Sequence, residues 1–299
     1  MPEVTPDQLA RLATSEIPDS DPMALFEAWF TEDKASELND ANAMALAAIG
    51  FAKAKRRRQI MIAATSIGPG AANMVTAAGT AMANRLPVLL LCGDTFLTRL
   101  PDPVLQQMEH YGDPSLGLND AFKSVSRYWD RITHPAQVLQ SLPAAIATLI
   151  DPADCGPAFL GLPQDVQGWA YDYPEAFFEK RINRIRRQMP DGEELAEAAR
   201  LLRSAQRPVI IAGGGVQYSR AVVELTRFAE VHAIPVIETI AGRANLLATH
   251  PLNIGPVGVT GAESANVVSE KADLVIGVGT RFQDFTTGSW ALFKNPNRK

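Results

Sequence analysis

The chain has 299 residues and a formal net charge of −5, with 20% charged and 46% hydrophobic positions. This length accommodates two domains, and the composition is that of an ordinary globular protein. The negative charge argues against a polyanion-binding surface, so we expect no nucleic-acid partner. No apolar run approaches the roughly 18 residues of a membrane span, so we expect no membrane partner.

The cysteines, histidines and basic residues further limit the kinds of protein and of binding site that this chain can represent. Cys92 and Cys155 lie in apolar, strand-like sequence, which predicts buried free thiols and a cytoplasmic location. The four histidines have no close spacing to the cysteines, so we expect no protein metal site. The basic run from Lys53 to Arg58 fits a helix C-terminus, where cations meet the negative end of the dipole, better than a nucleic-acid site.

The chain opens with a segment that does not resemble the rest. Residues 1–40 are acidic, contain proline and show little periodicity, so we separate them as an atypical N-terminal segment. From Ala41 to Lys55 the sequence is rich in Ala, Met and Leu, which favours a helix. An apolar strand, Ile60 to Ala64, leads into T-S-I-G-P-G-A-A-N at Thr65 to Asn73.

The stretch from Thr65 to Asn73 is the most informative part of the sequence. Gly68 and Gly70 supply positive φ angles at no steric cost, and Pro69 fixes φ near −65°. The small residues that follow predict a helix that another backbone can approach closely. With an apolar strand at Pro87 to Cys92, the stretch predicts a βαβ unit whose turn can hold a ligand.

Further along, the sequence predicts the end of one partial domain and then part of a second. The first domain, residues 41–175, continues through a loop-rich stretch; residues 176–191 form a basic linker and residues 192–299 a second domain. Apolar strands that alternate with helices and end in glycine are typical of an open parallel sheet. We therefore expect an α/β chain with two parallel-sheet domains. The expected strands after the linker are 208–212, 235–238 and 274–278, and the expected helices are 193–205, 220–232 and 264–272.

An ordered set of motifs gives the chain a family resemblance. T-S-I-G-P-G-A-A-N, R-L-P-V-L-L-L-C-G-D and P-D-P-V-L-Q-Q-M-E resemble the pyrimidine-binding domain of thiamine-diphosphate enzymes, the family of acetolactate synthase and pyruvate oxidase. S-V-S-R-Y-W-D-R-I, D-P-A-D-C-G-P-A and L-P-Q-D-V-Q are similar to one branch, the hydrolases of the trihydroxycyclohexane-1,2-dione ring in myo-inositol catabolism. The resemblance runs from about Asn42 to Lys299.

The resemblance implies a truncated pyrimidine-type domain followed by a truncated Rossmann-like middle domain. It also implies thiamine diphosphate with Mg²⁺ as cofactor, a small cyclic dione as substrate and a homo-oligomer in the complete enzyme. The family binds Mg²⁺ and the diphosphate through a C-terminal G-D-G motif. The nearest string here, Gly93-Asp94-Thr95, lies in the wrong domain, so we expect this chain alone to be inactive and to carry no metal ligands.

The resemblance also assigns cofactor-binding residues. In the family, the residues that match Pro69 and Asn73 flank the pyrimidine ring, and Gly68 and Gly70 shape the turn. A proline gives a rigid apolar wall, and an amide can hydrogen-bond a heteroaromatic nitrogen. The structural alternative is a tight turn in which Asn73 caps the next helix. The resemblance favours the cofactor site.

Gln107, with Gln106 beside it, is the candidate catalytic residue. Related enzymes place a loop glutamine at about this distance past the turn, where it reaches the reacting centre. A neutral amide there orients a carbonyl or hydroxyl without adding charge. From the residues alone, a solvated polar loop is an equally good interpretation.

The activating acid of the family is missing from this sequence. In the family a glutamate hydrogen-bonds N1′ of the aminopyrimidine and drives the tautomer that forms the nucleophile. The alignment puts that glutamate at Ala41, which cannot exchange a proton. Asp40 and Glu37 are near in sequence, but neighbouring residues on a helix point about 100° apart. Either the local register shifts so that Asp40 or Glu37 replaces the glutamate, or this chain lacks the activating acid; we favour the loss.

The glycines at Gly213-Gly214-Gly215 follow a strand, as phosphate-binding turns do. They lack the G-x-G-x-x-G spacing and an acidic ribose ligand, so we expect a structural turn, although some relatives hold FAD in this domain.

Taken together, the sequence indicates a fragment of a thiamine-diphosphate-dependent C–C hydrolase. An acetolactate-synthase-like enzyme and a non-catalytic scaffold fragment remain as alternatives. Ala41 and the missing G-D-G favour the scaffold for this chain taken alone.

Overall fold

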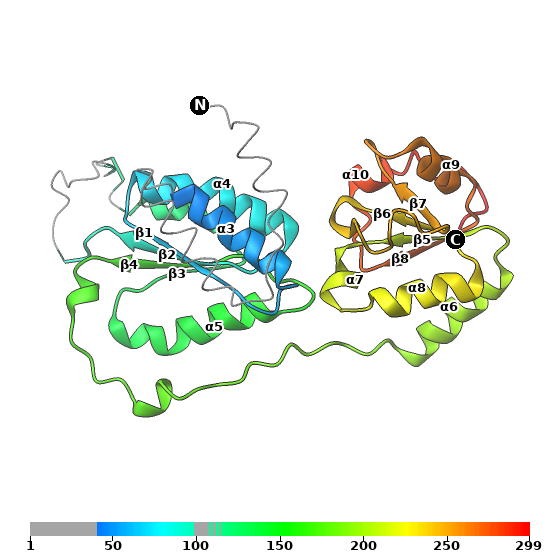
Figure 1. The fold of residues 1–299 in the computed structure, drawn as a ribbon. Helices are drawn as coiled ribbons and strands as arrows, with labels where there is room; N and C mark the ends of the chain where they lie inside the picture. Colours follow the sequence, from blue (N-terminus) through cyan, green and yellow to red (C-terminus); the bar gives the residue numbers. More distant parts are fainter. Residues whose placement is uncertain (1–40, 99–107, 109, 111, 114) are drawn as a thin grey trace, which may run out of the picture. The chain divides into compact units, whose positions relative to one another are not determined.

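The computed structural model describes residues 41–98, 108, 110, 112–113 and 115–299. Within them the expected α/β class is confirmed, since helices alternate with strands and the strands form two separate, all-parallel sheets (Figure 1). No helix formed by these residues is long and apolar enough to span a membrane.

The first domain contains one four-stranded sheet in the order β1-β2-β4-β3. Its strands are β1 (Ile62–Thr65), β2 (Leu89–Asp94), β3 (Tyr128–Arg131) and β4 (Ala158–Pro163). Its helices are α3 (Ala41–Ala54), α4 (Pro69–Asn84) and α5 (Val138–Ile150), with 3-10 turns η1 (Leu118–Ser124), η2 (Pro135–Gln137), η3 (Val166–Gly168) and η4 (Glu175–Phe177).

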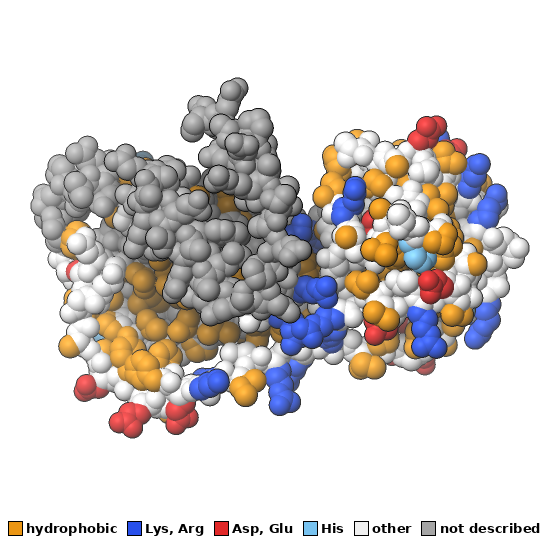
Figure 2. All heavy atoms as spheres, in the orientation of Figure 1, with side chains coloured by type: hydrophobic (Ala, Val, Ile, Leu, Met, Phe, Trp, Pro, Cys, Tyr) orange, Lys and Arg blue, Asp and Glu red, His pale blue; other side chains and the backbone are white. Residues whose placement is uncertain are grey.

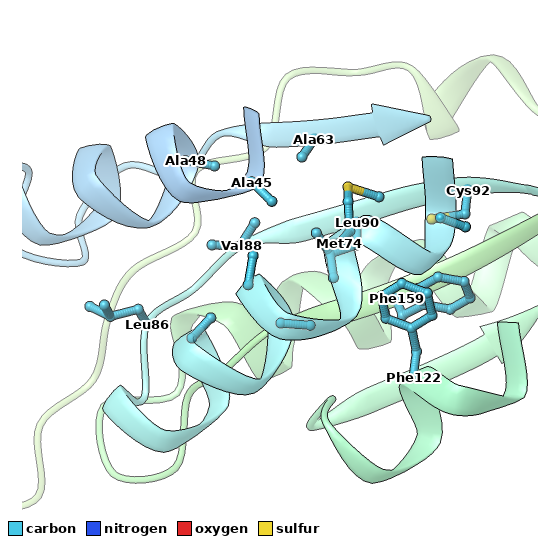
Figure 3. Packing of buried hydrophobic residues seen from close by; sticks show 14 residues of the cluster. Ala45, Ala48, Ala63, Met74, Leu86, Val88, Leu90, Cys92, Phe122 and Phe159 are labelled. Atoms are coloured by element: carbon cyan, nitrogen blue, oxygen red, sulfur yellow. The ribbon is translucent and has the colours of Figure 1, made fainter. Parts of the chain in front are cut away.

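Helices cover both faces of this sheet. Successive residues of a strand point to opposite faces, so one strand contributes to the core on each side. Leu90 and Cys92 pack with Met74 of α4, whereas Leu89 packs with Leu149 of α5. Small side chains allow α3 and α4 to approach each other and the sheet (Figure 3). The buried alanines of these two helices in this cluster are Ala45, Ala48, Ala71, Ala77, Ala78 and Ala81.

Two local features differ from the sequence-based expectation. The turn after β1 ends at Gly68, because Pro69 and Gly70 already belong to the first turn of α4. Strand β3 was not predicted, since its four residues, Y-W-D-R, are all half-buried and show no apolar alternation. Parallel pairing with β4, from Tyr128 opposite Ala158 onward, creates this strand.

The second domain contains a four-stranded sheet in the order β7-β6-β5-β8. Its strands are β5 (Pro208–Ala212), β6 (Val236–Glu238), β7 (Asn253–Pro256) and β8 (Leu274–Val278). Its helices are α6 (Gly192–Ser204), α7 (Gly214–Tyr218), α8 (Val222–His232), α9 (Glu263–Lys271) and α10 (Asp284–Thr287), with the 3-10 turn η5 (Ile240–Gly242).

Helices cover both faces of the second sheet as well. Ile210 packs with Leu225 of α8 on one face, and Val209 packs with Ala265 of α9 on the other. On the visible face of this domain, Lys and Arg side chains are spread among hydrophobic and uncharged ones (Figure 2).

Candidate functional site

The turn between β1 and α4 has a backbone that only glycine fits at two positions. Gly68 has φ of +85°, a conformation that side chains of L-residues rarely adopt. Gly70 does not have the positive φ that we expected, because it lies in the first turn of α4. A Cβ at Gly70 would lie 2.5 Å from Oγ1 of Thr65. Pro69 occupies the start of the helix, where its missing N–H costs nothing. The G-P-G sequence therefore fixes a sharp entry into α4.

Pro69 and Asn73 lie on one face of α4, because residues four apart share a helix face. Both are exposed, whereas Ala71 and Met74 between and after them are buried. The helix is capped by Gly68 without a side-chain hydrogen bond, and Asn73 lies inside the helix. The alternative in which Asn73 caps α4 is therefore wrong. The ring of Pro69 and the amide of Asn73 are therefore exposed on the same face of α4.

A buried ion pair lies at the same edge of the sheet as this turn. Asp94 ends β2 and Arg131 ends β3, and Nε of Arg131 lies 2.7 Å from Oδ2 of Asp94. The intervening strand β4 carries Gly161, where a Cβ would lie 2.7 Å from the same oxygen. Gly161 thus leaves room for the pair to cross β4. The Asp94 side chain is 1% exposed, so the pair is screened little by water.

The charges around Arg131 reinforce each other. Burial of Arg131 opposes its charge, but the hydrogen bond and the charge of Asp94 outweigh this and raise the pKa of the guanidinium. Burial also disfavours charge on Asp120, yet hydrogen bonds from Lys123 and the Gly117 amide hold the pKa of that carboxyl below its usual value. The carboxylate of Asp94 is therefore already paired with a cationic side chain, that of Arg131. Among the described residues, no group of three His, Cys, Asp or Glu side chains is placed to hold a metal ion.

Sequence reasoning used W-D-R and L-C-G-D only as family motifs and missed this pair. The two residues are 37 positions apart. A signal was present only for Asp94, which ends the apolar strand β2; Arg131 ends β3, whose residues give no strand signal of their own.

Two family models match the chain. The thiamine pyrophosphate enzyme N-terminal TPP binding domain matches residues 17–113, and the thiamine pyrophosphate enzyme central domain matches residues 195–299. The first match contains β1, the turn, α4 and β2, and the second contains the whole of the second sheet. The chain carries the N-terminal and central domains of the thiamine pyrophosphate enzymes. The N-terminal match begins within residues 1–40, the segment that we separated as atypical.

Curated relatives of one kind share this two-domain region. The 3D-(3,5/4)-trihydroxycyclohexane-1,2-dione hydrolase of Geobacillus thermodenitrificans is 54% identical over 252 residues, covering 84% of this chain and 39% of the relative. Hydrolases of the same name from Bacillus cereus (strain AH820) and Bacillus anthracis (strain CDC 684 / NRRL 3495) are 51% identical over 269 residues, covering 88% of this chain and 42% of each relative. The expected family branch is confirmed. The chain spans about two fifths of the length of these relatives.

Several predicted residues of the N-terminal TPP binding domain lie outside the described residues. Gln106 and Gln107 belong to residues 99–107, and Glu37 and Asp40 belong to residues 1–40. Ala41 is the first residue of α3. The assignment of the family's glutamate to this position, and the role of Gln107, therefore stay predictions.

Asp165, which sequence reasoning also missed, binds the chain just after β2. Its carboxylate accepts hydrogen bonds from the amides of Leu97 and Thr98 at 3.0 and 2.9 Å and from the Thr98 hydroxyl at 2.7 Å. It also accepts from the Val166 amide at 3.0 Å. Asp165 thus joins the segment after β4 to the segment after β2, at the carboxyl edge of the sheet.

In the central domain, the three consecutive glycines pack against backbone. A Cβ at Gly213 would lie 2.2 Å from the Gly279 oxygen, and one at Gly215 would lie 2.7 Å from Cα of Gly279. The amide of Gly215 donates to the Gly279 oxygen at 3.0 Å. The Gly215 N–H is therefore already used and is not available to a phosphate. Gly214 and Gly215 begin α7, so this stretch is the start of a short helix rather than the structural turn that we expected.

Proposed function

We propose that this chain forms the N-terminal and central part of a thiamine-diphosphate-dependent hydrolase that cleaves a C–C bond of trihydroxycyclohexane-1,2-dione. The observation that carries the proposal is the 54% identity to the Geobacillus hydrolase over 252 residues. The order of the two matched domains along the chain supports it. The proposed substrate, a small cyclic dione, follows from the name of these relatives.

Pro69 and Asn73 are the residues that we propose to hold the aminopyrimidine of the cofactor. Their outward placement on one face of α4 supports this role. The side chain of Asn73 makes no hydrogen bond with the described residues, so its amide is available to a heteroaromatic ring. Gly68 and Gly70 set the backbone that presents both side chains.

Thiamine diphosphate, when bound, supplies the electron sink that cleavage of a C–C bond beside a carbonyl requires. The protein's part is orientation and control of protonation. We propose that Gln107 orients a carbonyl or hydroxyl of the dione through its neutral amide. Because the family's glutamate matches Ala41, we infer that this chain provides no carboxylate of its own to the pyrimidine and supports at most slow turnover.

We further propose that Mg²⁺ and the diphosphate bind to residues outside this sequence, in a homo-oligomeric enzyme. The two buried thiols, Cys92 and Cys155, support a reducing, cytoplasmic setting. Burial, and to a smaller degree the charge of Asp94, raises the pKa of Cys92, so this thiol is inert. Ala41 and the expected lack of a G-D-G motif favour the alternative of a non-catalytic scaffold.

The test is a fusion of this chain to the C-terminal part of the Geobacillus hydrolase, assayed with thiamine diphosphate and Mg²⁺. We expect the fusion to consume the dione slowly, and we expect a fusion with Asn73→Ala to consume none. The same assay with pyruvate tests the acetolactate-type alternative. If the fusion folds and an Ala41→Glu version of it consumes neither substrate, the scaffold is the better description.

A further inference from the structure

We propose that Arg131 is a positioning residue that, with Asp94, fixes the carboxyl end of β2 against the turn preceding Pro69. The inference deepens the proposed function, on which it rests for the meaning of that turn as a cofactor site. All the contacts that connect Arg131 to this turn lie within the first domain.

The first connection runs through Asp94. Its Oδ2 receives Nε of Arg131 at 2.7 Å, and its Oδ1 receives the Thr95 amide at 2.8 Å. Asp94 therefore has both carboxylate oxygens engaged and is held in one orientation. The preceding residue, Gly93, touches the turn, because a Cβ on it would lie 3.0 Å from the backbone nitrogen of Ile67. A shift of Asp94 would be transmitted to the turn by backbone contact.

The second connection runs through Trp129, on the same strand as Arg131. The guanidinium carbon of Arg131 lies 5.3 Å from the centre of the Trp129 ring. The indole Nε1 donates to the backbone oxygen of Asn119 at 3.0 Å, and Nδ2 of Asn119 donates to the oxygen of Gly93 at 2.8 Å. Asn119 is fully buried. Both connections from Arg131 thus converge on Gly93, the residue that abuts the turn.

The presence of an arginine at position 131 is better explained by its holding of β2 in place than by a contribution to the stability of the fold. A buried ion pair is weak evidence for stability, because desolvation offsets most of the attraction. Arg131 reaches Asp94 through Nε and lies 3.5 Å from Asp120 through another nitrogen. The planar fork of arginine can hold two carboxylates in a fixed geometry, whereas lysine offers a single charged point.

Hydrogen exchange of this chain, measured by NMR, provides the test. The Ala72 amide donates to Gly68 at 3.0 Å and reports the junction of turn and helix. The Ala158 amide donates to Val88 at 3.0 Å and reports opening of the same sheet at its opposite edge. We expect Arg131→Lys to speed exchange at Ala72 at least about tenfold relative to Ala158. A uniform loss of stability would change both amides alike.

The matched control is Arg127→Met, which removes the same residue type just before β3. Arg127 pairs with Asp154, whose side chain is 57% exposed, and its amide donates to Pro157 near the amino edge of the sheet. We expect this variant to leave the ratio of exchange at Ala72 to that at Ala158 unchanged.

Arg131→Met is the change that matches this control, and we expect it to speed exchange at Ala72 as Arg131→Lys does. If Arg131→Met fails to fold, the double variant Asp94→Asn/Arg131→Met replaces it in the test, since it leaves no unpaired buried charge. We expect it to restore protection at Ala158 but not at Ala72. Wild-type protection at both amides in this variant or in Arg131→Lys would overturn the proposal. Binding of 4-amino-2-methylpyrimidine, followed in the same spectra, reports separately on the cofactor site, so failure of that binding in the wild type would contradict only the proposed function.

Discussion

The carboxylate of Asp165 accepts two hydrogen bonds from Thr98, one from the Thr98 amide at 2.9 Å and one from the Thr98 hydroxyl at 2.7 Å, although the two residues are 67 positions apart. Both residues follow strands that lie side by side, β4 and β2. A single carboxylate therefore joins two segments at the carboxyl edge of the first sheet. The adjacent strand β1 ends at the same edge, where the turn that leads to Pro69 begins.

The Asp165 contact predicts a pH-dependent contribution to stability. Burial raises the pKa of Asp165, but the hydrogen bonds from Thr98, Leu97 and Val166 outweigh it, and the net pKa is lowered. A lowered pKa means stabilisation that is present above the unfolded value of about 3.9 and is lost as pH falls through the folded value. We expect Asp165→Asn to cost about 1 kcal/mol at pH 7 and nothing well below pH 3.

Urea unfolding at a series of pH values measures this difference. Asp172→Asn is the control, because Asp172 is exposed and makes no hydrogen bond with the described residues. An Asp165→Asn penalty that stays constant down to the most acidic pH would show that its charge is not what binds Thr98.

The close approach of Gly213 to Gly279 predicts a large effect of one methyl group. Gly213→Ala would place its Cβ 2.2 Å from a backbone oxygen that cannot move alone, so we expect the central domain to lose at least about 2 kcal/mol. Gly192→Ala is the control, since a Cβ there meets nothing within 4 Å and the residue starts α6. We expect that change to be neutral or to stabilise by up to about 1 kcal/mol. Urea unfolding followed by circular dichroism compares the two, and equal stabilities would refute the packing role.

Cofactor binding by the chain alone is expected to be weak. The contacts that we propose for Pro69 and Asn73 with the pyrimidine are few, and we expect the diphosphate to bind residues outside this sequence. Calorimetric titration with thiamine diphosphate and Mg²⁺ should therefore give no dissociation constant in the micromolar range or below. A micromolar constant would mean that these domains bind the diphosphate by another route.

Restoring the acid at position 41 tests the assignment of the missing glutamate. In the fusion with the C-terminal part of a relative, Ala41→Glu should speed C2 proton exchange of bound thiamine diphosphate by about 10² to 10⁴-fold, the usual range for general acid–base catalysis. NMR measures this exchange directly, with Ala41→Gln as a control of similar size and no acid. Equal exchange in all three proteins would indicate that Asp40 or Glu37 already supplies the carboxylate.

The sequence by itself determined the elements whose signal is local. Apolar runs bounded by glycine and proline predicted β5 and β8 at their observed bounds, and G-P-G predicted the entry into α4. These predictions succeeded because neighbouring residues determine both the backbone angles of a turn and the apolar character of a strand in a parallel sheet covered on both faces. The motifs also identified the family branch, since each is a short contiguous string.

The tertiary structure decided what depends on residues far apart in the chain. Strand β3 exists because β4 pairs with it, and the ion pair of Asp94 and Arg131 exists because Gly161 leaves space between their strands. Likewise, position 213 requires glycine because the backbone of Gly279, just after β8, packs directly against it. Hydrogen bonds, ion pairs and close packing act over a few ångströms in space, so only the folded chain shows which distant residues they join.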